Sequence, residues 1–366
     1  MKKDISSENY QSNCFIGHDL ECKPQRNLAS YLLAALLIIF LSSHSSRAQV
    51  EQAQVGFRFL ENPVSAEAMG KAGSGVATMT NSEAIYWNPA GIGWIQKQID
   101  LNVNYTVGIA NINYLAPSIA VKLGEFGVVA FDGIIMDYGN FYGTRRADNA
   151  EGYVETGTFS PQAFAFGVGF SQKISDHFSY GVHVKYAYQN LGSAWVGTAG
   201  TGISDPNLQI AAIKYARGEP AFDVGAYYDF LFHGIRFGAS LQNVSRQITY
   251  EQQSFLMPFA VNFGLTVAPL SFLMSDGSAS SHSLIISVES THPRDFNESV
   301  HFGAEYDFAK ILSLRAGYMT GLDQRGLTAG LGLSEDFAGS TLHVDYAYEP
   351  FGVFGAVHYI SFGMAY

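Results

Sequence analysis

The segment "FSYGVHVKYAYQ", residues Phe178–Gln189, gives the strongest indication of the fold, because every second position in it is apolar. Successive side chains of a β-strand point to opposite faces of a sheet, so this alternation predicts a strand with one apolar face and one polar or small face. The apolar positions are Phe178, Tyr180, Val182, Val184, Tyr186 and Tyr188, and the intervening positions are Ser179, Gly181, His183, Lys185, Ala187 and Gln189.

The same rhythm recurs beyond Ile99 and predicts fourteen strands. An even strand number is the rule for single-chain bacterial outer-membrane barrels. If both chain ends lie in the periplasm, connections after even-numbered strands are periplasmic and short, and only Ala268–Ser281 departs from this pattern. The two longest connections, Gly139–Glu155 and Leu191–Gly218, follow odd strands and are expected outside the cell. The predicted strands are about 99–110, 112–123, 126–138, 157–174, 176–190, 219–231, 234–246, 252–268, 283–291, 297–308, 311–320, 324–334, 340–349 and 354–366.

Two architectures accommodate such strands. A soluble sandwich buries its apolar face, whereas an outer-membrane barrel turns that face to lipid and keeps polar residues inside. Several strands of ten or more residues, and Tyr and Phe at strand ends, favour the barrel. The chain also ends in a strand, "AVHYISFGMAY", whose last residue, Tyr366, resembles the C-terminal aromatic signal of the barrel-assembly machinery. We therefore predict an all-β fold: a 14-stranded antiparallel transmembrane β-barrel over residues 99–366.

Composition agrees with this prediction. Only 14% of the 366 residues are charged, and the chain contains 38 Gly, 27 Phe and 21 Tyr. No run of eighteen apolar residues occurs outside the N-terminal leader, which argues against a helical membrane protein. The net charge of −11 makes nucleic acid an improbable partner.

The N-terminus carries the features of a secretory signal peptide, predicted to be residues 1–48. Leu28–Leu41 is an apolar stretch of fourteen residues, preceded by Lys23 and Arg26 and followed by a cleavage site before Gln49. As a helix it reaches about 21 Å, too short for a comfortable membrane span, although an N-terminal membrane anchor is the alternative. Both cysteines, at positions 14 and 22, precede the cut, so the exported chain is expected to have no disulfide and no thiolate site.

Residues 49–98 do not alternate, and we predict that they form a helical or irregular hatch inside the barrel. Glycines interrupt a short helical stretch, and the stiff segment "EAIYWNPAGIGW", Glu83–Trp94, follows. Asn88 and Pro89 favour a turn and Gly91 supplies backbone freedom, so Trp87, Asn88, Pro89 and Gly91 are predicted to form a structural hatch turn. Trp87 and Trp94 are expected near the periplasmic interface.

No catalytic constellation emerges, so an enzyme is not predicted, and neither a cofactor nor a metal is expected. Ionisable residues on the predicted inward face are ordinary for such barrels, where they pair with one another or contact water. A hydrolase built on His343 and Asp345 needs a serine nucleophile motif, which the sequence lacks. The inward ionisable residues are His183, Glu305, Asp307, His343, Asp345 and Glu349.

The block "FRFLENPVSAEAMGKAGSGVATMTNSEAIYWNPAGI" resembles the N-terminal signature of the PorV/PorQ family of Bacteroidetes-type outer-membrane proteins, within the wider FadL-like barrel group. The segments "DHFSYGVHVKY" and "LHVDYAYEPFGVFGAVHYISFGMAY" resemble strands of that family. The resemblance implies a fourteen-stranded barrel with a lumenal hatch over about residues 64–93, in the outer membrane of a Gram-negative bacterium. The resemblance does not separate PorV from PorQ or from a FadL-type transporter.

For function, the resemblance implies a role in type IX secretion. A PorV-type protein receives the C-terminal signal domain of exported cargo and shuttles it to machinery at the cell surface. Outer-membrane lipid, cargo proteins with type IX signal domains, the secretion machinery and the barrel-assembly machinery are the partners expected. Two alternatives remain open: a FadL-type transporter of hydrophobic small molecules, and a purely structural barrel.

Overall fold

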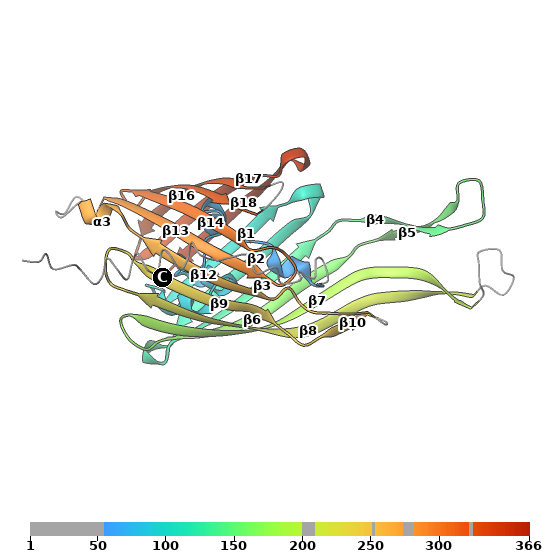
Figure 1. Ribbon diagram of the computed structural model, residues 1–366, viewed down its shortest axis with the longest axis horizontal. Helices are drawn as coiled ribbons and strands as arrows, with labels where there is room; N and C mark the ends of the chain where they lie inside the picture. The colour runs from blue at the N-terminus through green and yellow to red at the C-terminus, as the bar shows by residue number, and fades with distance from the viewer. Residues whose placement is uncertain (1–54, 200–208, 251–252, 274–280, 322–324) are drawn as a thin grey trace, which may run out of the picture. The chain divides into compact units, whose positions relative to one another are not determined.

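The computed structural model describes residues 55–199, 209–250, 253–273, 281–321 and 325–366, and the predicted signal peptide lies outside them. The main sheet is a closed antiparallel barrel, which confirms the predicted fold class and its fourteen strands (Figure 1). Around the barrel the strands are β1 (Ile99–Val107), β2 (Asn113–Lys122), β3 (Val128–Asp137), β6 (Gln162–Lys173), β7 (Phe178–Ala199), β8 (Gln209–Asp229), β9 (Arg236–Val244), β12 (Ala260–Val267), β13 (His282–Pro293), β14 (Ser299–Phe308), β15 (Leu312–Met319), β16 (Leu327–Phe337), β17 (Ser340–Pro350) and β18 (Ala356–Ala365).

The last strand closes the barrel against the first. β18 pairs with β1 from Asp100 opposite Ala365 to Val107 opposite His358. Beyond that register, the backbone amides of Ile99 and Tyr366 each donate to the other residue's carbonyl oxygen at 2.8 Å. The terminal aromatic residue therefore lies at the seam, where its backbone completes the sheet.

The two faces of the sheet differ as the alternation predicts. On β1 the side chain of Leu101 is 37% exposed whereas Asn102 is fully buried, and on β7 Val182 is 41% exposed whereas His183 is 2% exposed. Both strands thus turn their large apolar side chains outward, and such an outer surface suits lipid. The sheet closes on itself, which excludes the soluble sandwich.

The structure corrects the prediction for the long connections, which contain strands of their own. β4 (Phe141–Arg146) and β5 (Tyr153–Phe159) form a separate hairpin, β10 (Ile248–Tyr250) and β11 (Gln253–Phe255) form another, and β7 and β8 continue pairing beyond the barrel. The predicted strands 157–174 and 252–268 were therefore too long at their starts. Both faces of the β4–β5 hairpin are largely exposed, so its sequence carries no apolar alternation to reveal it.

The remaining helices are short. η4 (Ile109–Asn111), η5 (Gly124–Phe126), α3 (Leu270–Leu273) and η7 (Gly352–Phe354) lie in connections between strands. Among the residues described, none of the helices is long and apolar enough to cross a membrane.

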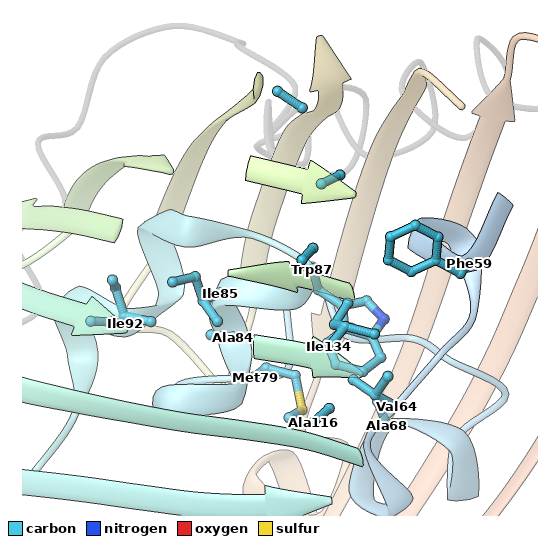
Figure 2. Close-up of a cluster of buried hydrophobic side chains, with 14 of the residues drawn as sticks. Phe59, Val64, Ala68, Met79, Ala84, Ile85, Trp87, Ile92, Ala116 and Ile134 are labelled. Carbon is cyan, nitrogen blue, oxygen red and sulfur yellow. The ribbon is translucent and has the colours of Figure 1, made fainter. Parts of the chain in front are cut away.

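Residues 55–98 fold as a chain of short helices inside the ring of strands. These helices are η1 (Arg58–Glu61), α2 (Ala66–Gly70), η2 (Ser82–Tyr86) and η3 (Pro89–Trp94). α2 packs against β15 to β18, η2 against β1 to β3, and η3 against β6 to β8. Figure 2 shows the resulting core, in which Met79, Ile85 and Trp87 from this segment gather with Ile134 of β3. We call residues 55–98 the hatch.

Inward-facing glycines let the hatch backbone lie directly against the strands. A Cβ atom on Gly181 of β7 would lie 2.3 Å from the Pro89 carbonyl carbon, and one on Gly317 of β15 would lie 2.4 Å from the Ala72 amide nitrogen. Other inward glycines of β6 to β9, β12 and β14 to β16 likewise lie against hatch atoms, so the inner wall fits the shape of the hatch. Its glycines are Gly169, Gly181, Gly225, Gly238, Gly264, Gly303, Gly317 and Gly330.

Replacing Gly181 with alanine should loosen the hatch, because the new methyl group would meet backbone atoms that have nowhere to move. We expect the Gly181→Ala variant to lose about 1–3 kcal/mol of unfolding free energy. Urea unfolding of the protein in lipid measures this loss. Val182→Ile is the matched control, since Val182 is the adjacent outward residue. Equal stability of the two variants would contradict the close packing.

Candidate functional site

A cavity of about 690 Å³ lies between the hatch and the inner wall of the barrel. Hatch residues supply much of its apolar lining, notably Val64, Ile85 and Trp87. Ile134 of β3 and Ala165 of β6 add apolar surface from the wall. Its size falls within the range of small-molecule binding pockets, which is about 300–1,000 Å³.

The predicted hatch turn borders this cavity and is fixed by hydrogen bonds. Asn88 precedes η3: its side-chain oxygen accepts from the Ala90 amide at 3.1 Å, and its side-chain nitrogen donates to the carbonyl oxygens of Val76 at 3.0 Å and Ala226 at 2.9 Å. Pro89 opens the helical turn, where a missing amide hydrogen has no cost. Asn88 thus joins the turn both to the rest of the hatch and to β8.

Gly91 and Trp87 complete this turn. A Cβ atom on Gly91 would lie 2.5 Å from the Met79 carbonyl oxygen, so a side chain there would push the two hatch segments apart. Trp87 is 8% exposed, and its indole nitrogen donates to the Gly73 carbonyl oxygen at 3.0 Å. Trp87 and Gly91 therefore hold the middle of the hatch together.

The expectation that Trp87 lies near the periplasmic interface is wrong. Trp87 lines the lumenal cavity, and Gln242, near the end of β9 that leads into the connection with β10, donates to its carbonyl oxygen. Trp94, in contrast, contacts the β6–β7 turn region, where its indole donates to Ser179 and the Lys173 ammonium lies 4.2 Å from its ring centroid. The sequence pattern alone did not show that the two tryptophans contact different parts of the barrel.

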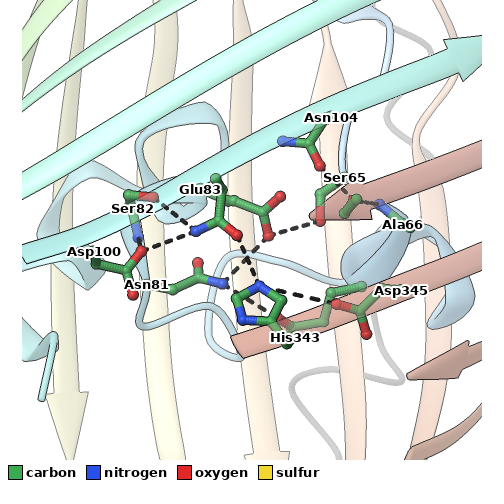
Figure 3. A network of polar contacts seen from close by, with 12 residues as sticks. Ser65, Ala66, Asn81, Ser82, Glu83, Asp100, Asn104, His343 and Asp345 are labelled. Carbon is green, nitrogen blue, oxygen red and sulfur yellow. Dashed lines mark hydrogen bonds and ion pairs between the residues drawn. The ribbon is translucent and has the colours of Figure 1, made fainter. Parts of the chain in front are cut away.

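A buried polar network fixes the hatch to β1 and β17 (Figure 3). Glu83 accepts hydrogen bonds from Ser65 at 3.1 Å and from Asn81 at 3.2 Å. The neighbouring Ser82 amide donates to Asp100 at 2.8 Å. Burial, reinforced by the nearby Glu67 carboxylate, raises the pKa of Glu83 to about 8. Glu83 is therefore protonated at neutral pH, as a fully buried carboxyl group without a cationic partner should be.

A second cluster fastens α2 to β14, β15 and β17. Lys71 forms ion pairs with Glu67 at 3.0 Å and with Glu305 at 3.1 Å. Arg315 contacts both Glu305 and Asp345. The Lys71 ammonium is 3% exposed, so breaking these pairs would leave a buried charge without a partner. The predicted inward residue Glu305 thus holds the hatch through Lys71, and Asp345 pairs with Arg315, which contacts the same Glu305.

A third cluster spans β3, β7 and β8 beside the cavity. His183 lies between two carboxylates, with Asp132 at 2.8 Å and Asp223 at 2.7 Å, and Lys185 contacts Asp223 at 2.8 Å. The sequence predicted the inward position of His183 but not these partners, since they depend on strand register. A Cβ atom on Gly167 would lie 2.0 Å from the His183 ring, so glycine there leaves room for the cluster.

The geometry gives no catalytic role to His343 and Asp345. His343 bonds Asn102 at 2.7 Å and lies 4.0 Å from Asp345, whose carboxylate Arg315 already engages. Within the described ranges, no group of three or more His, Cys, Asp or Glu residues is arranged to hold a metal ion.

The raised pKa of Glu83 predicts a pH dependence of the hatch. The unfolded chain releases this proton near pH 4.5, whereas the folded hatch retains it to about pH 8, so stability is greatest in acid and falls as the pH rises through that window. We expect intrinsic-rate-corrected amide exchange in Ser82–Tyr86 to quicken between about pH 5 and pH 9. Glu83→Gln should flatten the profile. If the corrected exchange rates of the unaltered protein did not change with pH, the raised pKa of Glu83 would be contradicted.

Comparison with known proteins supports the fold. No described protein family and no curated protein matches this chain. Solved structures do match: a Pseudomonas aeruginosa FadL homologue at 12% identity and TM-score 0.51, covering 83% of this chain and 98% of its own. The Ralstonia pickettii toluene transporter TbuX matches at 13% identity and TM-score 0.52, and the match covers 86% of this chain and 98% of TbuX. CymD, a monoaromatic hydrocarbon channel, matches at 13% identity and TM-score 0.50, and the match covers 82% of this chain and 96% of CymD. The chain thus has the fold of FadL-type outer-membrane barrels.

Proposed function

We propose that this protein is an outer-membrane channel that admits hydrophobic small molecules into the cavity between its hatch and the inner wall of the barrel. The cavity carries this proposal, since Ile85, Trp87 and Ile134 offer apolar and aromatic surface inside the lumen. The solved structures that share its fold include a toluene transporter and a monoaromatic hydrocarbon channel. They support this function better than the secretion role that the sequence resemblance implies.

The setting of this channel is also proposed. We take residues 1–48 as a cleaved signal peptide and the membrane as the outer membrane of a Bacteroidetes-type bacterium. The barrel-assembly machinery would insert the chain with Tyr366 at its closing seam. Since the hatch contacts the wall on most sides of the lumen, transit of a molecule beyond the cavity requires part of the hatch to move.

Filling the cavity tests the channel. Ala165→Phe would project a ring from β6 into the cavity, because Ala165 is an inward lining residue that is 1% exposed. We expect uptake of radiolabelled dodecanol by expressing cells to fall to the level of cells with an empty vector. Val168→Phe, which adds the same ring to the outward face of the same strand, should leave uptake unchanged. Full uptake by Ala165→Phe would refute the proposal.

A second candidate function, cargo handling in type IX secretion, is favoured by the hairpins outside the barrel. β4 pairs with β5 and with no other described strand, so both strands of this sheet keep a free edge. Tyr142 and Tyr153 on the hairpin are 83% and 47% exposed. Free edges and exposed aromatic residues suit the docking of a β-structured signal domain by strand addition.

Co-purification after gentle detergent extraction separates the two functions. Recovery of the secretion translocon, or of proteins bearing type IX signal domains, supports cargo handling, and deletion of residues 141–159 should abolish it. Recovery of the barrel alone with a bound hydrophobic compound supports the channel and argues against cargo handling.

A further inference from the structure

Glu289 is a buried carboxylate that faces the cavity without a cationic partner. It lies on β13, is 4% exposed and lines the cavity. The Val76 amide of the hatch donates to one of its oxygens at 2.9 Å. Among the described residues, no lysine or arginine forms an ion pair with it. A buried carboxyl group ionises at low cost only beside a cation, so a cationic ligand would complete an ion pair at this position.

The other charged groups around the cavity are already paired. Asp132 has His183 at 2.8 Å, and Glu61 has Arg58 at 2.9 Å. The cations of the lining are also engaged, since each contacts a carboxylate that is at least nine-tenths buried: Lys185 with Asp223, Arg58 with Asp295 and Arg325 with Glu349. A ligand carboxylate would therefore find these lining cations already neutralised, whereas a ligand cation would find Glu289.

A buried ring nitrogen without a hydrogen-bond partner lies beside Glu289. His301 on β14 is directly opposite Glu289 in the strand register, and it also lines the cavity. Its Nε2 contacts the Ser299 hydroxyl at 2.8 Å, while its Nδ1 is buried and has no hydrogen-bond partner. In the tautomer whose Nε2–H donates to the Ser299 hydroxyl, Nδ1 accepts a hydrogen bond, so Glu289 and His301 together then offer acceptors to a group with several donors.

Aromatic surface adjoins the same place. The Trp87 ring packs against Gly75, where an added Cβ would lie 2.4 Å from a ring carbon, and the next residue, Val76, bonds Glu289. Trp87 and Glu289 therefore both contact the hatch at Gly75 and Val76. A cation held near an indole ring gains further stabilisation, and the apolar lining around Ile85 and Ile134 can cover a hydrocarbon chain.

We propose that the cavity binds an amphipathic molecule whose polar end is a protonated primary amine, paired with Glu289 beside His301 and Trp87, and whose apolar body lies on the hatch core. An alkylammonium ion carries three donors and no acceptor, which matches the acceptors found there. This inference rests on the proposed channel function, whose cavity it uses, and specifies the class of molecule that the cavity selects.

Binding of three probes with the same chain length tests the inference. Dodecylamine, dodecanol and dodecanoate differ only in their polar ends. The protein in lipid nanodiscs, with Trp94 and the third tryptophan, Trp195, replaced by phenylalanine, keeps Trp87 as its one tryptophan. Trp87 fluorescence then reports occupancy of the cavity. We expect dodecylamine to bind more tightly than dodecanol, and dodecanoate to bind weakest.

Glu289→Gln isolates the charge, because the amide oxygen still accepts from Val76. We expect dodecylamine binding to weaken at least about tenfold, as for loss of one charge-assisted hydrogen bond, with dodecanol binding unchanged. Glu298→Gln is the control, since Glu298 lies in the β13–β14 connection and is half exposed. It should change neither affinity.

The outcomes distinguish the two levels of the proposal. Dodecanoate binding as tightly as dodecylamine, or an equal loss of dodecanol binding in Glu289→Gln, would overturn the amine inference and leave a hydrophobic-molecule cavity standing. No fluorescence response to any of the three probes would overturn both the amine inference and the channel.

Discussion

The fit of the hatch backbone against glycines of the inner wall is the constraint on which the rest of the structure depends. Where a side chain would normally fill the lumen, Gly181 and Gly317 admit the backbone at Pro89 and Ala72. A barrel of this strand number encloses more space than its own inward side chains fill. The hatch occupies that space, and its position determines which part of the lumen stays open.

The polar clusters follow from this arrangement. Because the hatch excludes water from much of the lumen, charges there need partners, and Lys71 and Arg315 supply them for Glu305 and Asp345. Glu83 has no cationic partner in the part of the chain that the structure describes, and its raised pKa keeps the carboxyl group protonated and uncharged instead. Glu289 has no cationic partner among the described residues, and it faces the open cavity. The same physical rule therefore explains both how the hatch is held and where a ligand charge belongs.

Much of the fold was predictable from the alternation of apolar and polar residues along the strands. Alternation as at Val182 and His183 fixes which side chains face outward, and the short even-numbered connections fix the strand number. Register was not predictable, so the partners of His183 on β3 and β8 were missed. The β4–β5 hairpin was missed because solvent on both faces leaves no alternation. The position of Trp87 depends on how the hatch packs inside the barrel, which no local pattern encodes.

A disulfide between the hatch and the wall tests the central claim most directly. A Cβ atom on Gly264 of β12 would lie 3.1 Å from the Cβ atom of Ala77, near the span of about 3.5–4.5 Å that a disulfide requires. With cysteine at both positions, oxidation in native outer membranes should yield a cross-linked peptide that joins the hatch to β12. If no cross-link forms and a membrane-impermeant maleimide labels position 77, the hatch does not fill the barrel as described.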